Sequence, residues 1–347
     1  MVMIIDGHED LAYNAVDLSR NLLGSVADIR QQEGMIPAHG EGTATVSLPA
    51  MRQADVRIVF STIFTYPAVS TVSVVPPGYH SSEEAFQRAR AQINFYHHLQ
   101  QNGEATLVCD QESLDAVVQQ QSPLPGLCLL MEGADPIRTP ADLEWFVERG
   151  VRIIGLSWKG TRYAGGTGAP GPLTDLGREL LHEMDRLGVV LDVSHLAEEA
   201  FWQAMTEYKG CVIASHANCR SLVPGERQLS DDMIKAIAER DGVIGLVCYN
   251  RFIRADWHSG DSKMGVNLDD LRRHADHLAT LVGVRHIGLG TDLDGGIGRE
   301  VVPREIDTIA DLPRFADVLA QAGYYQEDIN AIMGGNWLRV LRGVLLL

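Results

Sequence analysis

Eight short apolar segments recur along the chain, and most of them contain β-branched residues. They cover residues 2–5, 56–64, 126–131, 151–157, 188–194, 211–215, 242–247 and 286–290. Each is followed by polar residues, and amphipathic stretches separate several of them. Segments with so few polar positions are typical of parallel strands that are buried on both faces of a sheet.

Between the predicted strands, apolar residues recur with helical spacing. The pattern predicts helices over residues 82–100, 172–188, 267–282 and 308–323. Thr174 and Gly188 are typical start and stop residues for the second of these helices. Eight strands that alternate with helices predict a (β/α)8 TIM barrel. The length of 347 residues suits one barrel domain, residues 1–347, with extra loops.

Two loops rich in proline and glycine follow predicted strands. Residues 67–82 come after the second strand and residues 160–172 after the fourth. In a TIM barrel, the loops after the strands gather on the catalytic face. Both loops are therefore candidate lids over a pocket.

Side chains that can bind metal ions follow five of the eight strands. In chain order they are His8, Asp10, Glu132, His195, His216 and Asp292. His8 and Asp10 are two residues apart, so both lie on one face of an extended chain, and Glu9 between them points away. Because the carboxyl ends of barrel strands converge, the six side chains are expected to meet.

A single histidine at a strand end is usually a hydrogen-bonded structural residue, and this interpretation fits the other nine histidines. Three imidazoles and three carboxylates together would be a costly buried cluster without a cation. Such donors, with no thiolate, suit Zn²⁺ or a similar divalent ion. Six donors exceed the need of one catalytic ion, so we expect two metal ions bridged by a carboxylate.

Composition narrows the possible partners. The 46 acidic residues outnumber the 29 lysines and arginines, which gives a net charge of −17. Such a chain is repelled by phosphate backbones, which argues against a nuclease or any nucleic-acid partner. Five scattered cysteines without a CxxC pair predict free thiols in a reducing compartment. The first strand is too short for a signal peptide or a membrane span, so we expect no membrane insertion and a cytoplasmic location.

Several motifs together resemble the membrane (renal-type) dipeptidase family, peptidase family M19, whose members are amidohydrolase-type barrels. The motifs are DGHEDL, MEGAD, LTDLGRELLHEMDRLGVVLDVSH, SHANCR, GTDLDG and MGGNWLRV, and they run in order from residue 6 to about residue 340. The resemblance implies a zinc-dependent dipeptidase that cleaves L-Xaa-L-Xaa or L-Xaa-D-Xaa dipeptides with a zinc-activated bridging hydroxide. It also makes a homodimer possible.

The resemblance further implies a role for each candidate residue. His8 and Asp10 would bind one zinc ion, and His195 and His216 the other. Glu132 would bridge the two ions, and Asp292 would shuttle the proton of the bridging water. Arg227 matches the arginine that binds the terminal carboxylate of the substrate, and Tyr249 matches a tyrosine that lines the pocket.

One position departs from the family pattern. Renal members carry a histidine that contacts the substrate where this chain has Trp158. Trp158 could shape substrate preference, or it could simply pack at the rim of the barrel. The departure keeps open an alternative activity, hydrolysis of N-acyl-D-amino acids or other small amides and lactams, because fold and metals do not define the substrate. A metal-binding barrel without catalysis is a third interpretation.

Three further features have two interpretations or a local role. Asp6 could orient the site from behind or could be an exposed acid. Gly7 is expected to give the backbone room beside the metal ions. The apolar tail 340–347 could be a packed helix end or part of an interface.

Overall fold

Eight parallel strands form a nearly closed barrel, and a ninth, β3 (Thr106–Leu107), pairs with one of them outside the barrel order. The computed structural model describes residues 2–34, 42–68, 78–119 and 124–345. The strands are β1 (Ile4–Glu9), β2 (Val56–Phe64), β4 (Gly126–Glu132), β5 (Val151–Gly155), β8 (Val190–Asp192), β9 (Val212–Ile213), β10 (Ile244–Leu246) and β11 (Ile287–Leu289). They pair in the order β10-β11-β1-β2-β4-β5-β8-β9, and a bridge between Ala214 and Ile244 joins the two ends. The predicted TIM barrel is confirmed.

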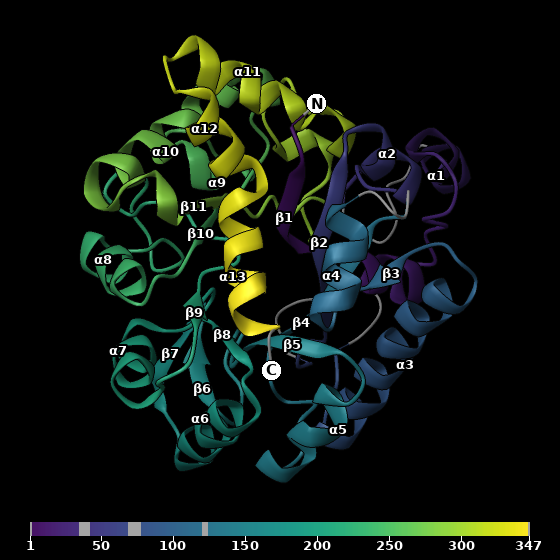
Figure 1. Ribbon diagram of the computed structural model, residues 1–347, viewed down its shortest axis with the longest axis vertical. Coiled ribbons are helices and arrows are strands. Elements are labelled where there is room, and N and C mark those ends of the chain that lie inside the picture. The colour runs from purple at the N-terminus through teal and green to yellow at the C-terminus, as the bar shows by residue number, and fades with distance from the viewer. Residues whose placement is uncertain (1, 35–41, 69–77, 120–123, 346–347) are drawn as a thin grey trace.

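Helices surround the barrel (Figure 1). They are α1 (Val26–Glu33), α2 (Leu48–Gln53), α3 (Ser82–Gln101), α4 (Gln111–Val118), α5 (Leu143–Val147), α6 (Asp175–Leu187), α7 (Glu198–Glu207), α8 (Asp231–Glu239), α9 (Asn250–Ile253), α10 (Leu268–Val282), α11 (Pro313–Gln321), α12 (Gln326–Asn330) and α13 (Asn336–Val344). All four predicted helices are present, although the last begins with a 3-10 turn, Ile309–Asp311, before α11. Thr174 caps α6 through the backbone N–H of Gly177, and Gly188 ends it with φ of 66°.

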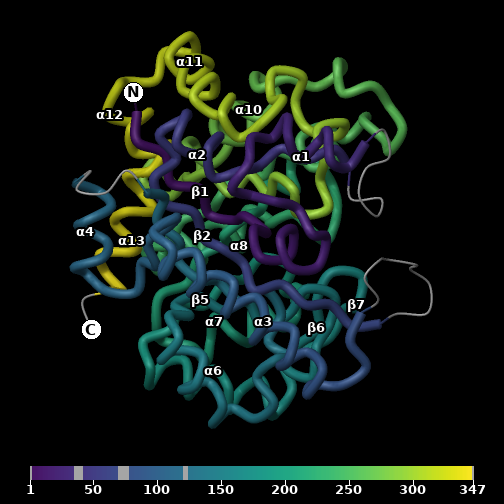
Figure 2. The backbone as a smooth tube through the Cα atoms, turned by 90° about the vertical axis from the view of Figure 1, so that its right-hand side faces the viewer, coloured from purple at the N-terminus to yellow at the C-terminus, as the bar shows by residue number. Residues whose placement is uncertain are grey.

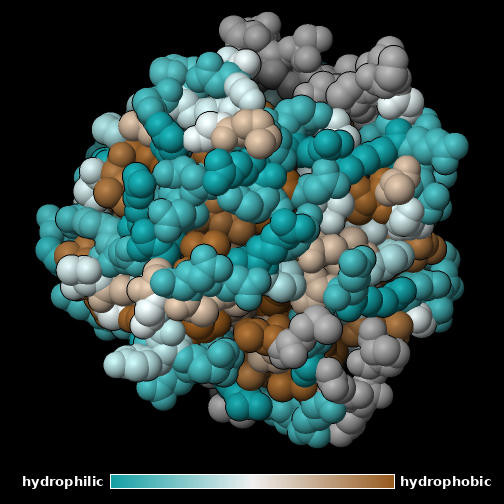
Figure 3. Space-filling view, turned by 90° about the horizontal axis from the view of Figure 1, so that it is seen from above, coloured by the Kyte–Doolittle hydropathy of each residue, from teal (hydrophilic) through white to brown (hydrophobic). Residues whose placement is uncertain are grey.

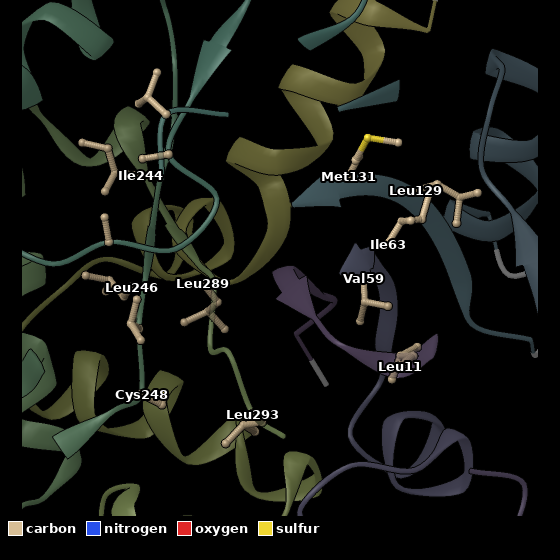
Figure 4. Close-up of a cluster of buried hydrophobic side chains, with 14 of the residues drawn as sticks. Leu11, Val59, Ile63, Leu129, Met131, Ile244, Leu246, Cys248, Leu289 and Leu293 are labelled. Carbon is tan, nitrogen blue, oxygen red and sulfur yellow. The ribbon is translucent and has the colours of Figure 1, made fainter. Parts of the chain in front are cut away.

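The strands separate two layers of core. In β2, Ile58 and Phe60 belong to the inner cluster, whereas Val59 packs in the outer cluster between barrel and helices. Figure 4 shows outer side chains that come from strands on opposite sides of the barrel, among them Ile63 and Leu246. Both clusters are buried, which explains why the strands carry few polar residues before their carboxyl ends.

Helix α13 covers the amino end of the barrel. Trp337 is fully buried there, lies 4.9 Å from the Phe60 ring and donates a 2.7 Å hydrogen bond to the Leu289 carbonyl. Val340, Leu341 and Leu345 are also buried, so the C-terminal tail is a packed helix end as far as residue 345.

The prediction that Gly7 gives the backbone room beside the metal ions was wrong. A Cβ on Gly7 would lie 2.8 Å from the Trp337 ring and 2.7 Å from the Ser215 carbonyl oxygen. The missing side chain therefore makes room for the packed barrel interior rather than for metal ions.

Trp337→Ala should lower the free energy of unfolding by about 3–5 kcal/mol, because it empties the largest side chain from the inner cluster and leaves the Leu289 carbonyl unpaired. Urea denaturation of the metal-free protein measures this. Trp202→Ala is the control, since Trp202 is 39% exposed and should change stability by less than about 0.5 kcal/mol. A loss below about 1 kcal/mol for Trp337→Ala would contradict the assigned packing role.

The predicted loop 160–172 is not irregular. It contains a hairpin of β6 (Ala164–Gly166) and β7 (Ala169–Leu173). Figure 2 shows this hairpin at the opposite end of the molecule from α4 and α13, which places it on the carboxyl side of the strands. Of the other predicted lid, residues 69–77 lie outside the described residues.

The face in Figure 3 is mainly hydrophilic, with hydrophobic residues scattered between the polar ones. Among the described residues, no helix combines the length and apolar character that a membrane crossing requires.

The homodimer stays a prediction.

Candidate active site

Five of the predicted site residues lie at the same distance in sequence from the ends of their strands. Trp158, His195, His216, Tyr249 and Asp292 each stand three residues after the last residue of β5, β8, β9, β10 and β11. His8 lies within β1, Asp10 directly follows it, and Glu132 is the last residue of β4. The predicted convergence of the six metal-binding candidates is confirmed by the geometry below.

His8 is surrounded by carboxylates. Its Nε2 atom lies 3.6 Å from Glu132 Oε2 and 3.9 Å from oxygens of both Asp10 and Asp292. The side chain is fully buried, and Nε2 has no hydrogen-bond partner among the described residues. This atom is therefore free to act as a donor toward a cation between the carboxylates.

The other two histidines meet at the second oxygen of Glu132. Glu132 Oε1 lies 3.1 Å from His195 Nε2 and 3.5 Å from His216 Nε2. The two Nε2 atoms are 2.9 Å apart. Glu132 thus faces His8 with one oxygen and the His195–His216 pair with the other, which is the geometry expected of a bridging carboxylate.

Two of these residues have a strained backbone. His195 has φ of 65° and Asp292 has φ of 59°, the left-handed region that side-chain-bearing residues rarely adopt. Such a conformation costs about 1–3 kcal/mol and persists where the surroundings enforce it, often at functional sites. Here it turns both side chains into the barrel mouth immediately after the strand.

The protonation equilibria show a shortage of positive charge. Burial lowers the pKa of His8, but the nearby Glu132, Asp292 and Asp10 outweigh burial and raise it to about 10. Burial raises the pKa of Asp292 well above its usual range, and lowers that of His195 to about 4. The carboxylates around His8 therefore favour a cation beside its imidazole.

The donors fit divalent metal ions. Two groups of three residues that could hold a metal ion, His8–Glu132–His216 and His8–Asp10–Asp292, each have donor atoms within 4.8 Å of one another. Imidazole nitrogens and carboxylate oxygens are ligands of Zn²⁺ and of related ions. The unpaired His8 Nε2 and the carboxylate excess are the observations that support a metal centre.

The acids on the outer side of β1 support the site instead of forming it. Asp6 and Glu9 are both buried, and an oxygen of each lies close to the Thr291 hydroxyl oxygen, at 2.6 and 2.9 Å, so both share this one hydroxyl. Asp6 also accepts from the backbone N–H of His8 at 3.4 Å. The prediction that Glu9 points away is confirmed, and the exposed alternative for Asp6 is wrong.

A cavity of ≈ 320 Å³ opens over the cluster. One wall is aromatic: Phe64 lies 5.3 Å from Tyr13, 5.7 Å from Tyr66 and 5.2 Å from Trp158, measured between ring centroids. Trp158 therefore packs at the rim and lines the cavity, and its effect on substrate preference stays a prediction.

A second cavity of ≈ 510 Å³ adjoins the first and shares Trp158, His195, Tyr249 and Phe252 with it. Arg227 lines this second lobe, and its Nη2 atom lies 3.1 Å from His195 Nε2 and donates a 2.8 Å hydrogen bond to the His216 carbonyl. The residue is only 9% exposed, and burial lowers the pKa of its guanidinium. Among the described residues, no ion pair joins Arg227 to a carboxylate, and its Nε atom has no hydrogen-bond partner.

Comparison with known proteins identifies the family. The sequence profile of the membrane dipeptidase family, peptidase family M19, matches residues 1–346. The chain belongs to this family. An uncharacterised protein from the pqqA 5′ region of Klebsiella pneumoniae is 36% identical over 212 residues, which are 58% of this chain and 76% of that protein.

Other relatives of this M19 chain carry functional names. A dipeptidase of Claviceps purpurea is 29% identical over 231 residues, 63% of this chain and 52% of that protein, so the chain spans only about half of its length. A metallopeptidase of Rhodobacter sphaeroides, solved with a phosphinate mimic of the dipeptide L-Ala-D-Ala, superposes with a TM-score of 0.80, 24% identity and 99% of both chains covered. The Rhodobacter sphaeroides metallopeptidase therefore shares its fold with this chain.

Sequence reasoning missed several residues of this M19 site. The aromatic wall residues Tyr13, Phe64 and Tyr66 lie on separate segments, and only the tertiary fold brings them together with Trp158. The hydroxyls of Thr62, Thr167 and Ser215 contact Asp10, His195 and His216 respectively. A signal existed for one of them, because a serine directly precedes both His195 and His216.

The remaining cysteines and histidines have structural positions. All five cysteines are free, with Cys128, Cys219 and Cys248 buried and Cys109 and Cys211 partly exposed. The histidines outside the site lie away from it in helices and loops, as predicted, except His39, which is outside the described residues.

Proposed function

We propose that residues 1–347 form one domain that acts as a dinuclear metal-dependent dipeptidase, with Zn²⁺ as its preferred ion. One observation carries the proposal: the buried guanidinium of Arg227, which forms no ion pair with the residues that the structure describes, lies beside a six-donor cluster at two adjoining cavities. An arginine in this state recognises a carboxylate, and the end of a dipeptide places one within reach of the scissile amide.

The proposed division of the metal ligands follows the family resemblance, and the two-sided contacts of Glu132 support it. His8 and Asp10 would hold one ion, His195 and His216 the other, and Glu132 would contact both. When bound, two such ions supply a water of lowered pKa and polarise the amide carbonyl. The protein residues then supply the remaining steps.

Asp292 is the proposed proton carrier. It lines the ≈ 320 Å³ cavity, and its Oδ1 lies 3.9 Å from His8 Nε2. Burial raises the pKa of its carboxyl well above the usual value, which suits a group that accepts a proton from water and returns it to the leaving amine.

The two cavities suggest how a dipeptide would lie. Arg227 in the second lobe would hold the terminal carboxylate, with Trp158 and Tyr249 at the junction of the lobes. The aromatic wall of Tyr13, Phe64 and Tyr66 would then face the side chain of the first residue. Aromatic walls favour large apolar groups, so we expect apolar first residues to be preferred.

Arg227→Ala should mainly raise KM for dipeptides, by about 10²–10³-fold, because it removes a buried charge-assisted contact to the substrate carboxylate. Steady-state kinetics on a dipeptide and on its C-terminal amide measure this. The KM for the C-terminal amide should be nearly the same for the wild-type protein and the variant. An equal loss on both substrates would show that Arg227 does not bind the carboxylate.

A turnover screen on zinc-loaded protein tests the function itself. The panel contains L-Xaa-L-Xaa, L-Xaa-D-Xaa and N-acetyl-D-amino acids, and protein treated with a chelator is the control. Metal-dependent cleavage of dipeptides supports the proposal. Cleavage of N-acyl compounds alone would show that the site acts on the alternative substrate class. If the protein binds two ions and cleaves none of the compounds, it is not a hydrolase of these substrates.

A further inference from the structure

The serine before His216 contacts two of the proposed metal ligands at once. Ser215 Oγ lies 2.8 Å from His216 Nδ1 and 3.3 Å from His8 Nδ1. The imidazole rings of His8 and His216 are adjacent, with centroids 3.7 Å apart. All three side chains are at most 1% exposed, so water does not compete for these contacts.

Asp192, the last residue of β8, determines the direction of the Ser215 hydroxyl. Its Oδ2 lies 2.5 Å from Ser215 Oγ, and its Oδ1 accepts from the backbone N–H groups of Ser194 and Ser215 at 3.0 and 2.9 Å. A carboxylate can only accept, so the single hydroxyl proton of Ser215 points to Asp192. The two lone pairs of Ser215 are then left for the imidazole Nδ1–H groups.

The protons of both rings follow from this arrangement. An imidazole that donates from Nδ1 keeps a bare Nε2, which is the atom that can bind a metal ion. The Nε2 atoms of His8 and His216 are the ones that face Glu132, at 3.6 and 3.5 Å. We propose that Ser215, oriented by Asp192, is a positioning residue that holds both histidines for metal binding and so couples the two metal positions.

This inference rests on the proposed function, because it assigns His8 to one ion and His216 to the other. His195 is held differently: the Thr167 hydroxyl, in the β6–β7 hairpin, lies 3.0 Å from its Nδ1 atom. Thr167 therefore serves one metal position, whereas Ser215 serves both. This difference separates the proposal from a general structural role.

Ser194 provides a matched control. It is also a buried serine that precedes a metal-ligand histidine, and its Oγ lies 3.3 Å from Ser215 Oγ. Its hydroxyl accepts from the backbone N–H of His216 at 3.1 Å, and no hydrogen bond among the described residues joins it to an imidazole ring. Loss of Ser194 should therefore disturb packing to a similar extent without freeing either ring.

The experiment is a zinc titration of the metal-stripped full chain in competition with a chromophoric chelator. Ser215→Ala should weaken both zinc dissociation constants by about 10–100-fold. Thr167→Ala should weaken only one, and Ser194→Ala should leave both within about threefold. Asp192→Asn, which offers an amide N–H to Ser215 and so takes one of its lone pairs, should weaken both with Ser215 in place.

Melting of each metal-free variant separates misfolding from loss of metal affinity. If Ser215→Ala fails to fold, the Asp192→Asn titration decides the question. Unchanged zinc affinity, loss at one position only, or a loss equal to that of Ser194→Ala would overturn the proposal while the dipeptidase function stands. Failure of the wild-type chain to bind two zinc ions would overturn both.

Discussion

Asp292→Asn should lower kcat on dipeptides by about 10²–10⁴-fold, because the amide can neither accept the proton of water nor return it to the leaving amine. The substitution preserves the shape of the side chain. Glu132, and not Asp292, is the residue that contacts both His8 and His195. The variant should therefore still bind two metal ions. Steady-state kinetics and metal analysis of the same preparation measure both quantities.

The control for this variant is Asp256→Asn. Asp256 is exposed, is paired with Arg254 and lines neither of the two cavities, so its variant should keep wild-type kcat. A near-normal kcat for Asp292→Asn with both ions bound would remove Asp292 from the proton path. Loss of metal ions from this variant would instead assign Asp292 to metal binding.

Glu132→Gln should have the larger effect on the metal centre. It removes the one carboxylate that approaches His8 with one oxygen and the His195–His216 pair with the other. Changes around a ligand already cost about 10–100-fold in affinity, so loss of a shared ligand should weaken both ions by more than about 100-fold. Turnover at limiting zinc should fall in parallel.

Asp10→Asn is the matched comparison, since Asp10, whose Oδ1 lies 3.9 Å from His8 Nε2, is proposed to hold only the ion that His8 binds. It should weaken one ion and leave the other near its wild-type affinity. Calorimetric zinc titration of the metal-free chain distinguishes one weakened position from two. A Glu132→Gln variant that binds both ions normally would show that Glu132 does not bridge them.

The sequence alone was sufficient to predict the strands of the barrel and the residues at their ends. Runs such as 56–64 and 126–131 are apolar because both faces of each strand are buried, and this property is local. Parallel strands also share one direction, so polar residues that follow them must gather at one end. His8, Glu132, His216 and Asp292 could be placed together from this rule, and their distances agree with it.

Local pattern was less informative at two other places. The hairpin of β6 and β7 was expected as a loop that is a candidate lid, since its glycine-rich residues carry little strand preference. Gly7 was assigned to the metal site, although its neighbour in space is Trp337, which comes from the other end of the chain. The contact between Gly7 and Trp337 is not visible in the residues nearby in sequence, whereas the hairpin pairs neighbouring segments whose weak strand preference hides it.

Only the tertiary structure decided which side chains finish the site. Without the family resemblance, the residues around Arg227 predict only a solvated loop arginine, and the fold buries it beside His195 without an ion pair to a carboxylate among the described residues. The aromatic wall and the Asp192–Ser215 contact likewise join segments far apart in the chain. The physical reason is that burial and hydrogen-bond direction depend on every neighbour in space, whereas strand periodicity depends only on the residues of the strand itself.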